Sequence, residues 1–578
     1  MPGLKKFSNV DVIDIESVSS ASSIARIDDV DLFGLPLILR LTIANDGDSW
    51  DPTIKMNNGL GVIDWGDGTP TESVSIVDLP PHTYSTAGTY DVTLSPFKSS
   101  LTRTVGLSSF DTPDTQVTEV LAFGDCGRVG FRRWASLVTI PLNGYLDLTG
   151  VDFFQGAIFQ ECSSFVGPTS MSGYANLNLT SFLSLIFKEA PLFNRPGLND
   201  LDTSSVTTFF EAFAGASSFN QDISGWDVSL VQNMQAMFRD AISFDQPLNS
   251  WDVSLVGSMQ AMFYGASSFD QPLNNWDVSS AEDMGVMFRG ASSFNQDISG
   301  WDVGAVFSMG AMFAEASSFN QPLNSWDVSS VRFMGVMFSD ASSFDQPLNN
   351  WDVSSAEDMA SMFAGSSFNQ DISGWDVSSV KSIRRMFFDT SFDQPLNSWV
   401  VSAVTNMEAA FRNTSSFNQP LNSWDVSLVE DMQYMFSAAS SFDQPLNNWV
   451  VSAVTKMNNM FENASSFNQD ISGWDVGGVD TMTTMFRAAT SFDQNLGAWR
   501  FKNNADGSFF LLNSGISDAN LALCLEGWDS IGQGTGVDMS NMVVRTLSES
   551  TYPDAKTAYD NLIATYSWDL TNSITWVA

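Results

Sequence analysis

The chain has 578 residues, of which 25 are Lys or Arg and 66 are Asp or Glu, so its formal charge at pH 7 is −41. Such an acidic chain has no general basic surface to neutralise phosphates, which argues against nucleic-acid binding and against attraction to anionic membranes. The single His, His82, excludes sites built from several His, and three scattered Cys are too few for a disulfide framework.

The first 30 residues are rich in Ser and Asp and predict an extended arm. No apolar run comes after Lys5 and Lys6, so we expect no Sec-type export signal. The longest apolar stretch, 32–44, is shorter than the roughly 20 residues that cross a bilayer, and we expect no membrane insertion.

Residues 31–111 differ in composition from the remainder of the chain and predict short strands separated by Gly and Pro turns. The strings WGDG at 65–68, HTY at 82–84 and GTYDVTL at 88–94 resemble the PKD (polycystic-kidney-disease-type) immunoglobulin-like domain. The resemblance implies a small β-sandwich in which these residues shape turns and core, so a structural role is expected for His82.

Residues 112–500 are predicted to be a tandem repeat. Twelve Trp residues from Trp226 to Trp499 recur every 25 residues, or 24 at two steps, and a Phe stands seven residues before each. Weaker copies precede them, for example the spacing of Phe159 and Phe165. A period of this length indicates a solenoid or an array, with about fifteen units here.

Within one unit the sequence predicts one short strand and one short helix. Leu248, Trp251 and Val253 match the L-x2-L-x-L pattern of leucine-rich repeats, and Val256 to Ala266 shows apolar residues three and four apart. The fold class predicted is therefore an α/β leucine-rich-repeat-like solenoid preceded by an immunoglobulin-like β-sandwich. The Asn or Asp after each repeat Phe, such as Asp245, is expected to replace the usual asparagine ladder.

Residues 501–578 leave the repeat. A helix is predicted near 554–564, and this region is expected to cap the open end of the solenoid, because terminal units would otherwise expose apolar faces.

Repeats of the form FNQDISGWDVSSV, the DWGDG region and the C-terminal segment from Thr551 together resemble the BspA-type leucine-rich-repeat surface proteins, over about residues 35–578. The resemblance implies adhesion or recognition at a surface, on bacteria, in protists and algae, or in phage and virus particles. The absence of a visible export signal favours the virion exterior.

The Asp between Trp and Val of each unit is expected to point outward, because side chains alternate across a strand. Stacking would place these carboxylates in one column, formed by Asp227, Asp252, Asp277, Asp302, Asp327, Asp352 and Asp376. Three compensations for their repulsion are considered: hydrogen bonds from neighbouring Ser and Asn, raised pKa values, or bound cations such as Ca²⁺. The same surface, with Asn249, Ser250 and Ser254, offers hydrogen bonds to a polysaccharide or a repetitive protein.

Three functions are consistent with these observations. The first is a non-enzymatic virion component, such as a tail fibre or spike, that binds a host cell-surface glycan or protein and contacts other virion or surface proteins through residues 1–30. The second is a cellular adhesin or surface-layer protein, and the third is a polysaccharide depolymerase with paired carboxylates. No nucleophile elbow, P-loop or dinucleotide fingerprint favours an enzyme, and homo-oligomerisation is left open.

Overall fold

The computed structural model describes residues 184–578 without interruption. Before residue 184 it describes the strands named below, the turn at 65–70 and a few single residues, so the predicted repeats at Phe159 and Phe165 lie outside the described residues, as do Cys126 and Cys162. The chain divides into two compact units, one of residues 1–281 and 287–296, the other of 282–286 and 297–578.

The first unit begins with β-structure. Strands β10, β2, β8, β5 and β6 pair in that order, all antiparallel, while β1 pairs with β4 and β9, and β3 pairs with β7. Strand β10 lies beyond residue 111, the predicted end of this domain; an immunoglobulin-like arrangement of these sheets stays a prediction. The strands are β1 (Ala25–Asp29), β2 (Leu37–Ile43), β3 (Ser49–Trp50), β4 (Pro52–Lys55), β5 (Leu60–Asp64), β6 (Glu72–Ser75), β7 (His82–Thr83), β8 (Gly88–Pro96), β9 (Val105–Gly106) and β10 (Val117–Ala122).

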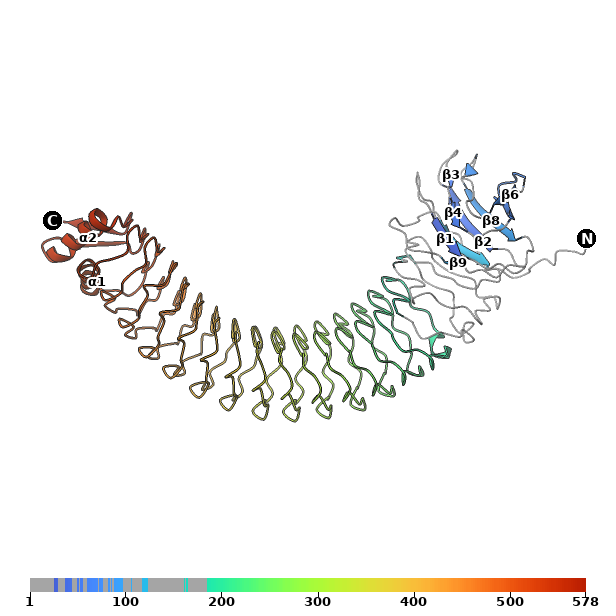
Figure 1. The fold of residues 1–578 in the computed structure, drawn as a ribbon, viewed down its shortest axis with the longest axis horizontal. Coiled ribbons are helices and arrows are strands. Elements are labelled where there is room, and N and C mark those ends of the chain that lie inside the picture. The colour runs from blue at the N-terminus through green and yellow to red at the C-terminus, as the bar shows by residue number, and fades with distance from the viewer. Residues whose placement is uncertain are drawn as a thin grey trace, which may run out of the picture. The chain divides into compact units, whose positions relative to one another are not determined.

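From residue 184 onward each unit consists of stacked coils of about 25 residues, which confirms the predicted solenoid (Figure 1). The first unit contains one short 3₁₀ helix, η2 (Leu198–Asp200). The Phe, Trp, Val and Met positions of the repeat are almost completely buried. Rings of successive coils stack, for example Phe219 on Phe244 at 5.6 Å in the first unit and Trp449 on Trp474 at 6.2 Å in the second.

The strand and the helix predicted for each repeat are both wrong. In place of the helix the chain makes overlapping turns closed by bonds from residue i+3 to residue i, such as Met435 N–H to the Met432 carbonyl at 3.2 Å. The intervening amides donate to the next coil, as Tyr434 does to the Asn458 carbonyl at 3.0 Å. At the predicted strand the chain makes another turn, closed by Trp251 N–H to the Leu248 carbonyl at 3.1 Å. Single-residue parallel bridges that join successive coils, for example Asn406 to Asp431, lie instead in the stretch predicted as helix.

In these turns residues other than glycine have positive φ, in the left-handed region of the backbone. Tyr434 and Ala438 have φ of 57°, and even the β-branched Val336 has φ of 64°. This conformation brings a side chain's Cβ close to its own backbone and costs about 1–2 kcal/mol per residue. It persists because it directs every second N–H toward the neighbouring coil, where a carbonyl accepts it.

Side chains complete the bonding between coils. The Asn or Asp that follows a repeat Phe accepts the main-chain N–H of its counterpart in the next coil and the side-chain amide of the Gln after that counterpart, which confirms the predicted ladder. Asp443, for instance, accepts Asn468 N–H and Gln469 Nε2, both at 2.9 Å. At the end of the repeats Asp493 accepts Ser517 N–H and Asn520 Nδ2 instead. Each indole in turn donates to a carbonyl of the preceding coil, as Trp424 Nε1 does to Leu396 at 2.9 Å.

The C-terminal region departs from the repeat sequence but continues the stack. Parallel bridges run from Asp506 to Asp538 and on to Asp569, and Trp528 donates to the Leu496 carbonyl at 2.8 Å. The elements here are α1 (Asp518–Ser530), β11 (Arg545–Ser548), α2 (Pro553–Tyr566) and β12 (Ile574–Val577), with β11 and β12 parallel. Helix α2 confirms the helix expected at 554–564. Burial raises the pKa of Cys524, in α1, to about 12.

The ladder makes the first testable prediction. Asp443→Ala removes the acceptor of two hydrogen bonds and leaves part-buried donors unpaired, which should lower the free energy of unfolding by about 1–3 kcal/mol. Asp443→Asn keeps an acceptor oxygen, and Asn occupies the same place at Asn418 and Asn468, so it should change stability by less than about 0.5 kcal/mol. Denaturant midpoints measure both; equal losses in the two variants would contradict the ladder.

The second prediction concerns backbone strain. Val336→Gly should stabilise the protein by about 1 kcal/mol, because Gly adopts positive φ without the steric cost that Val336 bears. Val336→Ala keeps a Cβ and should gain less than half as much. Val336 is 37% exposed, so little buried surface is lost in either variant. A loss of about 1 kcal/mol in the glycine variant, as for Gly in ordinary structure, would rule out the left-handed turn.

Candidate functional site

The predicted Asp column is exposed and occupies one position per coil. Asp227, Asp252 and Asp277 lie in the first unit, and Asp302, Asp327, Asp352 and Asp376 in the second. Each carboxylate accepts the N–H of the residue two further on. Where that residue is Ser, its hydroxyl can add a second bond: Ser329 donates from N at 3.1 Å and from Oγ at 2.6 Å to Asp327.

These bonds hold the carboxylates in the charged form. Side-chain and main-chain donation from the following Ser lowers the pKa of Asp227, Asp277, Asp327 and Asp376 below the ordinary Asp value. Raised pKa values, one of the three expected compensations, are therefore wrong for these four residues, and hydrogen bonding from Ser is present instead. Among the described residues no group of three or more Asp, Glu, His or Cys is placed to hold a metal ion, and a Ca²⁺ site on the column remains untested.

The other polar side chains expected to face a ligand on this surface are hydrogen-bonded within the protein, Asn249 and Ser250 to neighbouring coils and Ser254 within its own coil. Asn249 donates to Asn274 Oδ1 at 3.1 Å and accepts Asn275 N–H at 2.9 Å. Ser250 donates to the Ser224 carbonyl at 3.0 Å. Ser254 is hydrogen-bonded to Asp252. These bonds explain why the same residues recur from coil to coil, and they require no ligand.

His82 is placed as expected for a structural residue. Its ring stacks on Trp65 with centroids 4.5 Å apart, and Nε2 lies 2.8 Å from Asp67 Oδ2. Burial raises the pKa of Asp67, but hydrogen bonds with Thr69 and His82 outweigh it, so the pKa lies below the ordinary value.

A second surface of the coils was not singled out by the sequence patterns. It is formed by nine-residue stretches that we call the turn segments, in which the third, sixth and seventh residues are buried and most of the other six, the outer positions, are at least partly exposed. The turn segments are 232–240, 257–265, 282–290, 307–315, 332–340, 357–365, 381–389, 405–413, 430–438, 455–463 and 480–488.

Differences between repeats concentrate in these segments. The fifteen or sixteen residues that connect them read nearly the same each time, as ASSFDQPLNNWDVSSA does at both 266–281 and 341–356. In contrast, the six outer positions of a turn segment differ from coil to coil: GSMQAMFYG at 257–265 becomes KSIRRMFFD at 381–389. Comparing the repeats at each outer position, rather than reading their shared pattern, would have found this surface from the sequence.

Charge and exposed aromatic side chains show the same division. Between residues 232 and 488 all nine Lys and Arg lie in turn segments, and the connecting stretches contain none. The aromatic side chains that are not buried also lie there. The basic residues are Arg239, Arg289, Arg332, Lys381, Arg384, Arg385, Arg412, Lys456 and Arg487, and the aromatic ones are Tyr264, Phe307, Phe333, Phe388 and Tyr434.

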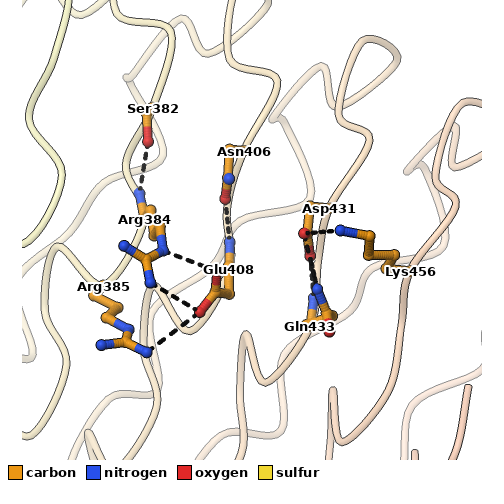
Figure 2. Close-up of polar contacts among 8 residues, drawn as sticks. All are labelled: Ser382, Arg384, Arg385, Asn406, Glu408, Asp431, Gln433 and Lys456. Atoms are coloured by element: carbon orange, nitrogen blue, oxygen red, sulfur yellow. Dashed lines mark hydrogen bonds and ion pairs between the residues drawn. The ribbon is translucent and has the colours of Figure 1, made fainter.

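Ion pairs join neighbouring turn segments of the second unit (Figure 2). The Glu408 carboxylate lies 2.8 Å from Arg384 Nε and 3.5 Å from Arg385 Nη2. Lys456 Nζ lies 3.2 Å from Asp431 Oδ2. Hydrogen bonding to Glu408 raises the pKa of Arg384. The arrangement places charged groups of both signs beside half-exposed rings, and such groups can form ion pairs and apolar contacts with a ligand.

The comparisons with known proteins agree with the repeat. A family model described as "Mycoplasma protein of unknown function, DUF285" matches residues 156–276, 268–367, 334–424, 364–449 and 405–519. The chain belongs to the DUF285 family. The matches overlap and span most of the solenoid of this DUF285 protein. No curated protein matches it. Among its described residues no helix is both long and apolar enough to span a membrane.

The third prediction tests the Asp column. Ser329→Ala removes the Oγ donor, the largest cause of the lowered pKa of Asp327, while the main-chain N–H remains. The pKa of Asp327 should therefore rise toward its ordinary value, as measured by NMR titration of the carboxyl carbon. A carboxyl pKa that is lower in the folded than in the unfolded state stabilises the fold at pH above the unfolded-state pKa. That stabilisation is lost as the pH falls through the folded-state pKa. An unchanged pKa in the variant would contradict the assignment.

Proposed function

We propose that this protein is a non-enzymatic recognition and attachment protein that binds its partner through the turn segments. The observation behind the proposal is the confinement of repeat-to-repeat differences, basic residues and unburied aromatic residues to the turn segments of each unit. Positions that only maintain the coil are uniform. Positions that touch a partner gain from being different, because specificity comes from distinct side chains placed side by side on a rigid body.

The setting that fits best is the exterior of a virus or phage particle, as a tail fibre, spike or other exterior component that binds a host cell-surface glycan or protein. The resemblance to BspA-type leucine-rich-repeat surface proteins and to PKD-like domains supports a role at a surface. Residues 1–30 are proposed to contact other virion proteins, and a homo-oligomer fits such a role equally well.

A cellular adhesin or surface-layer protein is the second candidate. It is favoured by the description of the DUF285 family, which names Mycoplasma, a cellular bacterium. A polysaccharide depolymerase ranks last. With so many acidic residues some carboxylates lie near one another by chance, so a close pair of carboxylates is weak evidence for catalysis. The Asp column, with or without Ca²⁺, remains the alternative binding surface to the turn segments.

The fourth prediction separates the two surfaces. The fluorescently labelled chain should bind host cells, and replacing Phe388, Arg412, Tyr434 and Asn458 together by Ser should weaken that binding at least tenfold. The matched control, Asp302, Asp327, Asp352 and Asp376 replaced by Asn, keeps the acceptor oxygens of the coils and should bind as the wild type does. The reverse pattern would move recognition to the Asp column, and absence of binding would contradict the proposed function.

The location of the protein decides between the virion exterior and the cell surface. Mass spectrometry of purified particles and of washed cell envelopes should find it in the particles. Its presence in envelopes alone would favour the adhesin, and its restriction to the cytosol would contradict both.

A further inference from the structure

One part of the turn-segment surface has an unusual composition. Three consecutive coils of the second unit bring together Arg385, Phe388, Arg412 and Tyr434, which we call the Arg412 cluster. The Arg412 guanidinium carbon lies 4.7 Å from the ring centre of Tyr434 and 5.7 Å from that of Phe388. The Arg385 guanidinium carbon lies 5.8 Å from the Phe388 ring centre. Two guanidinium groups and two aromatic rings thus meet across neighbouring coils.

Basic side chains are concentrated at this cluster in a strongly negative chain. Its three turn segments, 381–389, 405–413 and 430–438, contain four basic residues, Lys381, Arg384, Arg385 and Arg412, and four acidic ones, Asp389, Glu408, Glu430 and Asp431, so their charges balance at 4 − 4 = 0. Glu408 is shared by two of the guanidinium groups. Between 232 and 488, every turn segment except 381–389 contains at most one Lys or Arg.

Arg412 differs from two of its counterparts in other coils, whereas a third, Arg289, also lies beside a ring, 5.7 Å from the centre of Tyr264. Arg239 and Arg487 occupy the same place in their turn segments, and each lies close to a carboxylate: Arg239 Nη1 is 2.9 Å from Glu211, and Arg487 Nη1 is 3.2 Å from Glu462. Within the described part of the chain, Arg412 has two aromatic rings beside it and no ion pair. A guanidinium stacked on a ring is fixed in orientation, and its N–H edge stays available for the two oxygens of a carboxylate.

We propose that the Arg412 cluster binds a carboxylate-bearing sugar unit of a surface glycan. The guanidinium of Arg412 pairs with the carboxylate, and the rings of Phe388 and Tyr434 supply apolar surface for the C–H groups of the sugar. This proposal rests on the proposed function and names the class of partner for its surface.

An acidic sugar fits better than an acidic polypeptide or another polyanion. Paired acidic residues lie in the turn segment before the cluster, Glu357 with Asp358, and in the segment of Tyr434 itself, Glu430 with Asp431. An extended polyanion would run over these carboxylates and be repelled, and the chain's charge of −41 adds to that repulsion. A single carboxylate within a mostly neutral glycan can pair with Arg412 without running over them.

The fifth prediction is a calorimetric titration of the full-length chain with sialyllactose and trigalacturonate, compared with lactose and with hexaglutamate. At least one acidic sugar should bind at least tenfold more tightly than lactose, and more weakly as salt increases. Arg412→Gln and Tyr434→Ala should each reduce that affinity at least tenfold. Arg487→Gln, the matched control at the same place in its coil, should leave it unchanged.

Equal binding of lactose and the acidic sugars, tightest binding of hexaglutamate, equal effects of Arg412→Gln and Arg487→Gln, or no binding of either acidic sugar would each overturn the proposal. Such a failure is distinguishable from failure of the proposed function. If the chain still binds host cells through its turn segments, recognition stands and only the acidic sugar is excluded.

Discussion

The structure depends on satisfying the main-chain polar groups of each coil with groups from the next. A coil of 25 residues buries Phe, Trp and Met at its centre, and each N–H or C=O group that is buried there without a partner would cost about 1–3 kcal/mol. Over the turn segments the backbone solves this itself, because alternate amides bond within the coil and to the neighbouring coil. Elsewhere the solution comes from side chains: Asn or Asp after each Phe, and the indole of each Trp.

This constraint explains which residues the repeats share. The residue after each repeat Phe, such as Asp443 or Asn418, must offer an acceptor oxygen to the next coil. The repeat Trp, such as Trp424, must donate to the preceding coil, so both positions tolerate few other residues. The outer positions of the turn segments contribute mainly backbone to the coil, and they are free to differ. The coils are joined by side chains at fixed positions, so the outer positions of the turn segments can change without loss of the fold. The Arg412 cluster is an example of such a change.

Much of this could be predicted from the sequence, and the exceptions have physical reasons. The 25-residue period, the buried positions and the Asn or Asp ladder follow from residue type and spacing, as does helix α2. The helix predicted at Val256 to Ala266 is wrong because buried residues three and four apart also result from overlapping turns, and periodicity alone does not distinguish the two. Left-handed residues such as Val336 could not be foreseen, since their own preference opposes it and only the neighbouring coil maintains it. At the candidate site the exposed position of the Asp column could be predicted, and hydrogen bonding from neighbouring Ser is one of the three compensations that the sequence suggests. The pairing of Arg384 with Glu408 depends on coil geometry that the sequence does not state.

The most direct measurement is a crystallographic or electron cryo-microscopy map that resolves carbonyl oxygens in the turn segment 430–438. The account predicts Tyr434 and Ala438 with positive φ, and their amides directed to the carbonyls of Asn458 and Glu462 in the next coil. A continuous helix over the same residues, with each amide bonded four residues back within its own coil, would contradict it.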